Sequence, residues 1–205
     1  GDDSLNGGTG SDRLVGGLGN DTYFVGSSTD VVVELAGGGI DTVLSTSTSY
    51  TLASEVENAI QTSGIASFTG NVLDNYLKGG TGNDTLRGMD GNDRLEGGAG
   101  NDSLQGGNGN DIFVFAAAGF GADTIAGGFD FNPLGGQDLL DISGLGISAA
   151  TFNPSTVTIT DLGNDTRVTI GTAGSFLLQG VSDATTITIE DFILAGQVAP
   201  ASVAA

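Results

Sequence analysis

Four aspartates recur at nine-residue intervals in the middle of the chain, each at the end of a glycine-rich run. They are Asp84, Asp93, Asp102 and Asp111, in the units GGTGNDTLR, GMDGNDRLE, GGAGNDSLQ and GGNGNDIFV. Glycine reaches positive φ without steric cost, so each run predicts a tight turn whose backbone carbonyls can point inward. Carboxylate and carbonyl oxygens together form the hard ligand set that suits Ca²⁺. The spacing therefore predicts a series of calcium sites.

The same pattern occurs near the start of the chain, first complete and then degenerate. After a partial unit, GDDSLN, come GGTGSDRLV at 7–15 and GGLGNDTYF at 16–24. VGSSTDVVV at 25–33 keeps its aspartate, Asp30, and AGGGIDTVL at 36–44 restores the glycines and Asp41. Beyond the second array, GFGADTI at 119–125 supplies Asp123 after an insertion. Asn75 fills the aspartate slot upstream of that array without a charge, so its site with Asp93 is expected to be weaker.

A repeating structural unit must position these aspartates. The three residues after each aspartate are long enough for one short strand, whose middle side chain, such as Leu86, faces inward. One turn and one strand make half a coil, so successive coils stack about 4.8 Å apart. This stacking places Asp84 above Asp102 and Asp93 above Asp111, where the carboxylates repel unless a cation lies between them. One apolar side chain per unit is a thin core, so ion binding is expected to be coupled to folding.

Composition narrows the function classes. The 205 residues include 25 acidic and 5 basic side chains, for a net charge of −20, and no cysteine, histidine or tryptophan. This charge opposes binding to nucleic acid and to anionic membranes and favours cations. Disulfides and the usual zinc, copper and catalytic-triad chemistry are excluded by residue type. No run approaches the roughly 18 apolar residues of a membrane span, so membrane insertion is not expected.

The nonapeptide G-G-x-G-x-D-x-apolar-x resembles the RTX (repeats-in-toxin), hemolysin-type calcium-binding repeat. The resemblance implies an all-β fold, a right-handed parallel β-roll (β-helix) in two calcium-binding repeat blocks, closed by a C-terminal antiparallel β cap. The implied organisation is a first RTX repeat block at 1–44, a spacer with short β strands at 45–70, a second RTX repeat block at 71–125, and a C-terminal capping and secretion-signal region at 126–205.

Alternation of polar and apolar residues predicts four strands of the cap, at 157–160, 166–170, 175–181 and 185–192. These are expected to form an antiparallel hairpin set that closes the end of the roll. Helix is expected to be scarce, with one turn near 53–58.

In proteins of this family, one ion is held by the second and fourth carbonyls and the aspartate of one turn. The first and third carbonyls and the aspartate two units later complete the site. In the second array this resemblance pairs Gly80, Gly82 and Asp84 with Gly97, Ala99 and Asp102, and Met89, Gly91 and Asp93 with Gly106, Asn108 and Asp111. In the first array it pairs Gly8, Gly10 and Asp12 with Val25, Ser27 and Asp30, and Gly17, Gly19 and Asp21 with Ala36, Gly38 and Asp41. The other candidate ligands are Gly1, Asp3, Gly16, Leu18, Gly88, Asp90, Gly98, Gly100, Gly107, Gly109, Asp123 and Asp138.

The resemblance implies a calcium-binding β-roll that binds several Ca²⁺ ions, folds on Ca²⁺ binding outside the cell and carries a C-terminal type I secretion signal. Its partners would be calcium ions and the type I secretion apparatus. The protein would be secreted, extracellular or on the cell surface of a Gram-negative bacterium. A second hypothesis is a structural or adhesive calcium-dependent module, such as part of an S-layer or a polysaccharide-binding part of a larger secreted protein or enzyme. There, calcium would mediate self-association or contact with a cell-surface polysaccharide.

Catalysis is not expected within these residues. Asp138 and Asp141 flank two leucines, and a general acid–base pair needs only two carboxylates. Such a pair is more often a capping or ion site, and no nucleotide-binding or lipase motif accompanies it. Any catalytic domain would lie upstream.

Overall fold

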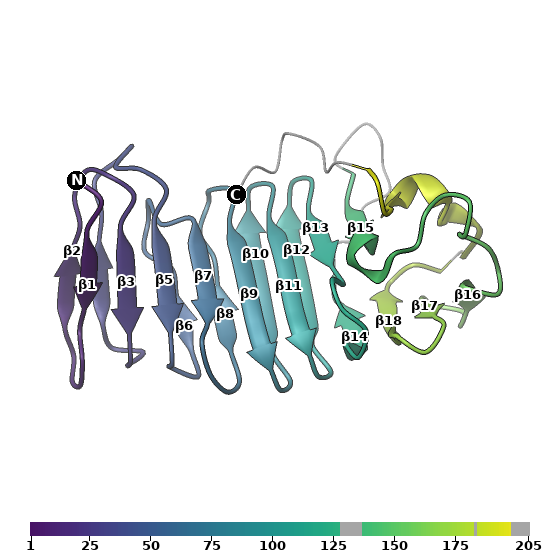
Figure 1. Cartoon of the computed structure of the whole chain (residues 1–205), viewed down its shortest axis with the longest axis horizontal. Coiled ribbons are helices and arrows are strands. Elements are labelled where there is room, and N and C mark those ends of the chain that lie inside the picture. The colour runs from purple at the N-terminus through teal and green to yellow at the C-terminus, as the bar shows by residue number, and fades with distance from the viewer. Residues whose placement is uncertain (128–136, 183, 198–205) are drawn as a thin grey trace.

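The computed structural model describes residues 1–127, 137–182 and 184–197, and these residues form a parallel β-solenoid with two main faces (Figure 1). One face is a sheet of nine strands, all paired in parallel. In spatial order they are β1 (Ser4–Asn6), β3 (Thr22–Val25), β5 (Thr42–Ser45), β7 (Asn58–Gln61), β9 (Tyr76–Thr81), β11 (Arg94–Ala99), β13 (Ile112–Val114), β15 (Leu139–Asp141) and β19 (Phe192–Ile193).

The opposite face is made by the alternate strands of the chain. Near the N-terminus, β2 (Arg13–Val15) pairs in parallel with β4 (Val31–Val33). The longer sheet contains, in spatial order, β6 (Tyr50–Thr51), β8 (Ser67–Thr69), β10 (Thr85–Asp90), β12 (Ser103–Asn108), β14 (Gly121–Ile125), β18 (Gly174–Gln179), β17 (Asp165–Ile170) and β16 (Val157–Asp161). From β1 to β15, consecutive strands thus alternate between faces, as the predicted half-coil requires.

Strand register in the second array follows the repeat. Leu86 of β10 lies beside Leu104 of β12, and Leu95 of β11 lies beside Leu77 of β9. The strands are six residues long rather than the expected three, because the pairing continues into the glycine run, where Met89 lies beside Gly107. The glycine turns are therefore partly strand.

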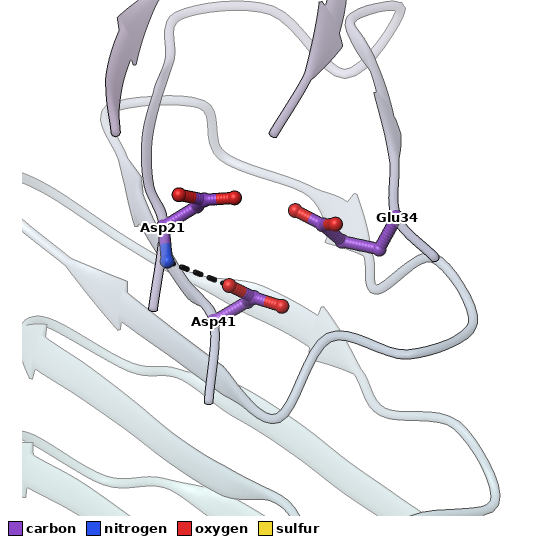
Figure 2. Close-up of side chains that lie close together, drawn as sticks. All are labelled: Asp21, Glu34 and Asp41. Carbon is purple, nitrogen blue, oxygen red and sulfur yellow. Dashed lines mark hydrogen bonds between the residues drawn. The ribbon is translucent and has the colours of Figure 1, made fainter. Parts of the chain in front are cut away.

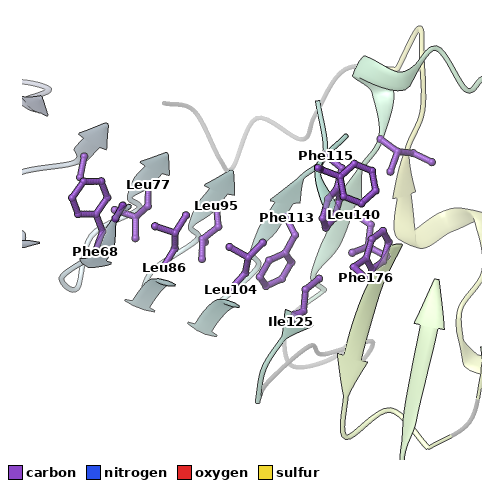
Figure 3. Packing of buried hydrophobic residues seen from close by; sticks show 14 of the residues in the cluster. Phe68, Leu77, Leu86, Leu95, Leu104, Phe113, Phe115, Ile125, Leu140 and Phe176 are labelled. Carbon is purple, nitrogen blue, oxygen red and sulfur yellow. The ribbon is translucent and has the colours of Figure 1, made fainter. Parts of the chain in front are cut away.

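The core is two single-file columns of apolar side chains, one from each face (Figure 3). Leu77, Leu86, Leu95 and Leu104 are each 0% exposed, as expected for the inward slot of each unit. Tyr23 and Phe113 occupy the inward slot of two other regular units, and the same columns continue outside the regular repeats with Val43, Ala59, Phe68, Ile125 and Leu140 in matching positions. Each coil therefore contributes about one buried side chain per face.

The C-terminal strands close one end of these columns. β18 pairs in parallel with β14, and β17 and β16 then add in antiparallel order. Phe176 of β18 stacks on Phe115 with ring centroids 4.3 Å apart, and Phe120 packs on both rings. The antiparallel cap predicted from 157–160, 166–170 and 175–181 is present.

The prediction of a fourth cap strand at 185–192 is wrong. This segment contains the 3₁₀ helices η2 (Ala184–Thr186) and η3 (Ile189–Asp191), and a further one, η1 (Ser143–Leu145), follows β15. The Asp191 carboxylate accepts a hydrogen bond from the Thr188 backbone N–H at 2.6 Å, and the Thr188 hydroxyl accepts one from Glu190 N–H. These local bonds replace a strand ladder. β19, which follows, pairs in parallel with β15 rather than antiparallel.

The helical turn expected near 53–58 is also absent. Glu55 has φ of +66°, which lies in the left-handed region and cannot continue a right-handed helix. The chain turns there instead, and β7 begins at Asn58. No α-helix occurs among the described residues, and none of their helices is long and apolar enough to cross a membrane.

Some of the expected C-terminal region falls outside the described residues. This applies to positions 128–136, 183 and 198–205 of the segment predicted to hold the cap and secretion signal. The division into two repeat blocks and a spacer remains a proposal. In the structure, β5 to β8 continue the stack of coils through residues 45–70, and their pairing joins the two arrays.

Candidate metal centre

The repeat aspartates are buried at the point where each turn enters its strand. Asp84, Asp93, Asp102 and Asp111 are between 0% and 2% exposed. The glycine run before each aspartate bends the chain, and the buried leucine or phenylalanine two residues later fixes its direction. A buried carboxylate needs a partner of opposite charge or hydrogen-bond donors, because removing the charge from water is costly.

One oxygen of each carboxylate is used in a ladder that joins the coils. The backbone N–H of Asp84 donates to Asp102 Oδ1 at 2.8 Å, and the N–H of Asp102 donates to Asp123 Oδ1 at 2.9 Å. At the other edge, the N–H of Asp93 donates to Asp111 Oδ1 at 2.9 Å. The aspartate side chain thus satisfies a backbone donor of the preceding coil.

Both ladders run well beyond the regular repeats. On the edge of the roll that holds Asp93 and Asp111, the same bond from a backbone N–H to an aspartate Oδ1 joins four more pairs, written donor first: Asp3 and Asp21, Asp21 and Asp41, Asn75 and Asp93, and Asp111 and Asp138. The edge of Asp84 and Asp102 also includes the pairs Asp12 to Asp30 and Ala66 to Asp84. Asp123 and Asp138 therefore occupy the aspartate slot despite their interrupted spacing.

The second oxygen of most of these aspartates has no hydrogen-bond partner among the described residues. This holds for the Oδ2 atoms of Asp12, Asp21, Asp41, Asp93, Asp102 and Asp111. Asp84 Oδ2 differs, since it accepts from Gly80 N–H at 2.8 Å, and Asp30 Oδ2 accepts from Gly26 and Ser27 N–H groups. Buried anionic oxygens without donors are the positions at which a cation fits.

Carbonyl oxygens converge on the same places, and the glycines make room for them. A Cβ on Gly79 would overlap both Asp84 Oδ2 and the Gly97 carbonyl oxygen. A Cβ on Gly88 would overlap Asp93 Oδ2 and come within 2.7 Å of the Gly106 carbonyl oxygen. The first glycine of a unit therefore leaves open the space where a carboxylate and a carbonyl two units later meet. These are the oxygen types of a Ca²⁺ site.

Other glycines face the coil below. Gly98, Gly100, Gly107 and Gly109 all have positive φ, and a Cβ on each would overlap the carbonyl of Gly80, Gly82, Met89 or Gly91 respectively. Some predicted carbonyl ligands already accept a backbone hydrogen bond. The carbonyls of Gly38, Ala99 and Asn108 accept from the glycine at the fourth position of a unit in the coil below, that of Val25 accepts from Thr46, and that of Ser27 accepts from Asp30. A carbonyl oxygen has a second lone pair, so such a bond leaves one position for a cation.

In the absence of an ion, burial raises the pKa of several of these carboxylates. Burial raises the pKa of Asp93 to about 8, and the nearby charge of Asp111 adds to the rise. Burial likewise raises the pKa of Asp123 to about 7 and that of Asp102 to about 6. A cation beside these groups reverses the effect, because it stabilises the charged form.

Asn75 places a side-chain amide in the aspartate slot. Its Nδ2 donates to the carbonyl oxygens of Val56 and Glu57, at 3.2 Å each, and to Asn71 Oδ1. Its Oδ1 accepts from Asn71 N–H at 2.8 Å. The side chain therefore links neighbouring coils where other units place a carboxylate.

Two groups of residues in these turns were not predicted as part of the site. The residue before the repeat aspartate forms a second ladder, in which Asn83 Oδ1 accepts from Asn101 N–H and Asn92 Oδ1 from Asn110 N–H, both at 2.9 Å. The recurring Asn-Asp pair in GND was its signal. Glu57 Oε2 accepts from Asp41 N–H at 2.7 Å and so fills an aspartate slot without any repeat signature.

Comparison with known proteins agrees with this geometry. A family model described as the RTX calcium-binding nonapeptide repeat (4 copies) matches residues 1–32, 69–103 and 87–117. The endo-1,3-1,4-beta-glycanase ExsH of Rhizobium meliloti (strain 1021) is 39% identical over 89 residues, which is 42% of this chain and 17% of the glycanase. The chain therefore spans only a small part of that curated relative.

Two solved structures from the mannuronan C5-epimerase of Azotobacter vinelandii are also similar. One subunit has a TM-score of 0.50 and 28% identity, covering 73% of this chain and 84% of that subunit. A second subunit has a TM-score of 0.41 and 28% identity, covering 65% of this chain and 93% of that subunit.

Proposed function

The chain is an RTX β-roll that carries calcium-binding nonapeptide repeats, and from this premise we propose that it folds on Ca²⁺ binding outside the cell and carries a type I export signal near its C-terminus. The ions lie between turns that are two units apart, with Asp84 and Asp102, Asp93 and Asp111, Asp12 and Asp30, and Asp21 and Asp41 as the paired carboxylates. The repeat blocks at 1–44 and 71–125 hold them, and residues 126–205 form the cap and signal region.

The observation that carries the proposal is the row of buried Oδ2 atoms without a donor among the described residues. Each coil adds about one buried carboxylate and one buried apolar side chain per face. The apolar gain is small, and the uncompensated carboxylates oppose folding. Bound calcium compensates the charge of the buried carboxylates, so folding is coupled to ion binding.

Export follows from the same coupling. Weak extracellular-type calcium sites have dissociation constants of about 10⁻⁴–10⁻³ M, far above the free calcium concentration of a cytosol. Inside the cell the acidic chain stays unfolded and can pass through a secretion channel. Outside the cell, calcium fills the turns, the coils form, and the folded segment cannot slide back.

Far-ultraviolet circular dichroism with and without a calcium chelator tests this proposal. The expected spectrum is that of a disordered chain in EGTA and of β structure at millimolar Ca²⁺, with Mg²⁺ at the same concentration as the control. Full β structure in EGTA at neutral pH would contradict it.

A second candidate is a calcium-dependent module of a larger secreted enzyme that acts on a polysaccharide. The observation in its favour is the similarity to parts of a glycanase and a mannuronan epimerase. The RTX repeat region is a calcium-binding fold and not a catalytic one, so we place any catalysis in a segment outside these residues. Calorimetric titration of the calcium-loaded chain with alginate and with a mixed-linkage β-glucan tests polysaccharide contact. Heat of binding would support the module, and its absence would favour the export role alone.

A further inference from the structure

Glu34 lies opposite the carboxylates of Asp21 and Asp41, in the first array (Figure 2). One oxygen from each of the three side chains lies within 4.8 Å of the others. Glu34 comes directly after β4 on one face, whereas Asp21 and Asp41 directly precede β3 and β5 on the other face, so all three lie in turns at one edge of the roll. Both ends of these turns therefore contribute carboxylates to one point.

Backbone donors orient these three side chains and leave one oxygen of each directed at the others. Gly17 and Leu35 N–H groups donate to Glu34 Oε2 at 3.1 and 3.2 Å. Asp21 N–H donates to Asp41 Oδ1 at 2.7 Å. Among the described residues, Asp21 Oδ2, Glu34 Oε1 and Asp41 Oδ2 have no partner, although each atom is buried. Three anionic oxygens face one another without a donor.

The Tyr23 hydroxyl is an independent sign of a ligand at this place. Tyr23 is 0% exposed and its hydroxyl also has no partner within the described part of the chain. A Cβ built on Gly16 would overlap Asp21 Oδ2 and the Tyr23 hydroxyl, and would crowd Glu34 Oε1. Oxygen atoms of Asp21, Tyr23 and Glu34 therefore surround a space that the glycine keeps open, and an Asp41 oxygen lies within 4.8 Å of those of Asp21 and Glu34.

We propose that Glu34 is a direct ligand of the cation bound by Asp21 and Asp41, and that these three carboxylates form the tightest ion site of the roll. This inference rests on the proposed function. The spacing of the repeat pairs Asp21 with Asp41 but says nothing of Glu34, which lies outside the aspartate slots. A third carboxylate raises the charge of the site to −3, which increases affinity for Ca²⁺ and even more for a trivalent lanthanide. The site joins the complete unit at 16–24 to the unit at 36–44, across the degenerate unit at 25–33, and it holds that part of the roll together.

Tyrosine-sensitised terbium luminescence tests the proposal with the metal alone. The chain has three tyrosines and no tryptophan, so the Tyr50→Phe/Tyr76→Phe variant keeps Tyr23 as the only sensitiser. In calcium-free buffer, this full-length variant is expected to bind Tb³⁺ in a tight phase with strong emission. Adding Glu34→Gln is expected to weaken that phase about tenfold or more. Adding Glu190→Gln removes the same charge from an exposed position and is the matched control, expected to change nothing.

The outcomes separate this inference from the proposed function. Circular dichroism at millimolar Ca²⁺ first establishes that each variant folds. Equal Tb³⁺ affinity of the Glu34→Gln and Glu190→Gln variants would overturn the role of Glu34 and leave calcium-dependent folding intact. If Tb³⁺ restores the circular dichroism of the Tyr50→Phe/Tyr76→Phe variant but gives no tight emission phase, no tightly bound ion lies beside Tyr23 and the site is overturned. If neither ion changes the spectrum of the unmodified chain, the proposed function and this site both fail.

Discussion

Asp93 donates its backbone N–H to Asp111 Oδ1 at 2.9 Å, and neither residue has a hydrogen-bond partner for its Oδ2 within the described part of the chain. Only one of the two oxygens of each carboxylate therefore accepts a hydrogen bond. One oxygen fixes the separation between coils, and the other is presented, buried, to the space between turns. The same division of labour is repeated at Asp102, which accepts from Asp84 N–H through Oδ1 and leaves Oδ2 without a donor.

The calcium-free chain is expected to gain stability as the pH falls. Burial raises the folded-state pKa of Asp93 to about 8 and that of Asp123 to about 7, well above the value of about 4 for an unfolded aspartate. A group with a raised folded pKa contributes stability that is present below its unfolded pKa and is lost as the pH rises through its folded pKa. Between about pH 4 and 8, the calcium-free roll should therefore lose β structure steadily with rising pH.

The measurement is circular dichroism of the decalcified chain across that range, paired with calcium titrations. Protons compete with calcium for the same oxygens, so the calcium midpoint should move to higher concentration at pH 5.5. A decalcified chain that unfolds further on acidification would contradict the assignment of these buried carboxylates.

Removing one buried charge from the ladder should weaken calcium-dependent folding. Asp93→Asn keeps an oxygen that can accept from Asn75 N–H but loses the anion, so the calcium midpoint is expected to rise several-fold. Asp74→Asn is the matched control, because Asp74 Oδ1 also accepts from a backbone N–H, that of Asn92, yet lies at the surface. Circular dichroism measures the calcium concentration at the midpoint of folding for both variants. Equal midpoints would show that the buried Asp93 carboxylate does not contribute to ion binding.

Asn75→Asp is expected to make the middle of the roll dependent on calcium. The amide of Asn75 donates to the Val56 and Glu57 carbonyl oxygens, and a carboxylate there would repel both. In EGTA the variant should be less stable than the unmodified chain, and at millimolar Ca²⁺ it should recover. Chemical denaturation at the two calcium levels measures this. Destabilisation of the same size in both conditions would mean that no ion enters this slot.

Two glycines in the same slot of the repeat should respond differently to alanine. Gly98 has φ of +103° and a Cβ there would overlap the Gly80 carbonyl, so Gly98→Ala is expected to cost about 2 kcal/mol or more. Gly80 has no positive φ and a Cβ there would make only ordinary contacts, the nearest at 3.6 Å. Gly80→Ala should therefore be close to neutral in thermal denaturation of the calcium-loaded chain. Similar losses for both would argue against the stacking of Gly98 on Gly80.

The ion pair between Arg94 and Asp141 should stabilise the junction of repeats and cap. Arg94 Nη2 lies 3.0 Å from Asp141 Oδ2, and the Asp141 side chain is only 8% exposed. Arg94→Gln is expected to lower the free energy of unfolding by about 1.5–3 kcal/mol, since a charged hydrogen bond to a buried carboxylate is lost. Arg87→Gln, at an exposed position of β10, is the control and should have little effect. Urea denaturation at saturating calcium compares the two.

The sequence was enough to predict the features that repeat. Leu86, Leu95 and Leu104 mark the inward slot by strict spacing, and the structure buries all three completely. The parallel solenoid and the stacked aspartates follow from the same period. The assignment of individual carbonyls to ions stays a prediction, because it follows from the family resemblance and not from the spacing itself.

Features fixed by long-range contacts could not be predicted in the same way. Glu34 reaches Asp21 and Asp41 because the turn between β4 and β5 folds back onto the turn of the preceding coil, and no repeat pattern marks it. Glu57 fills an aspartate slot through a longer side chain, after a spacing of 16 residues from Asp41 rather than the regular one. At 185–192, alternation suggested a strand, but Thr188 and Asp191 satisfy the backbone locally.

The two side-chain ladders point in opposite directions along the roll. An aspartate Oδ1 accepts from the coil before it, as Asp102 does from Asp84, whereas an asparagine Oδ1 accepts from the coil after it, as Asn83 does from Asn101. A folded coil therefore presents to the next coil one unpaired donor, the aspartate N–H, and one unpaired acceptor, the asparagine Oδ1, at fixed positions. A folded coil can therefore act as a template on which the next eighteen residues fold into the same conformation.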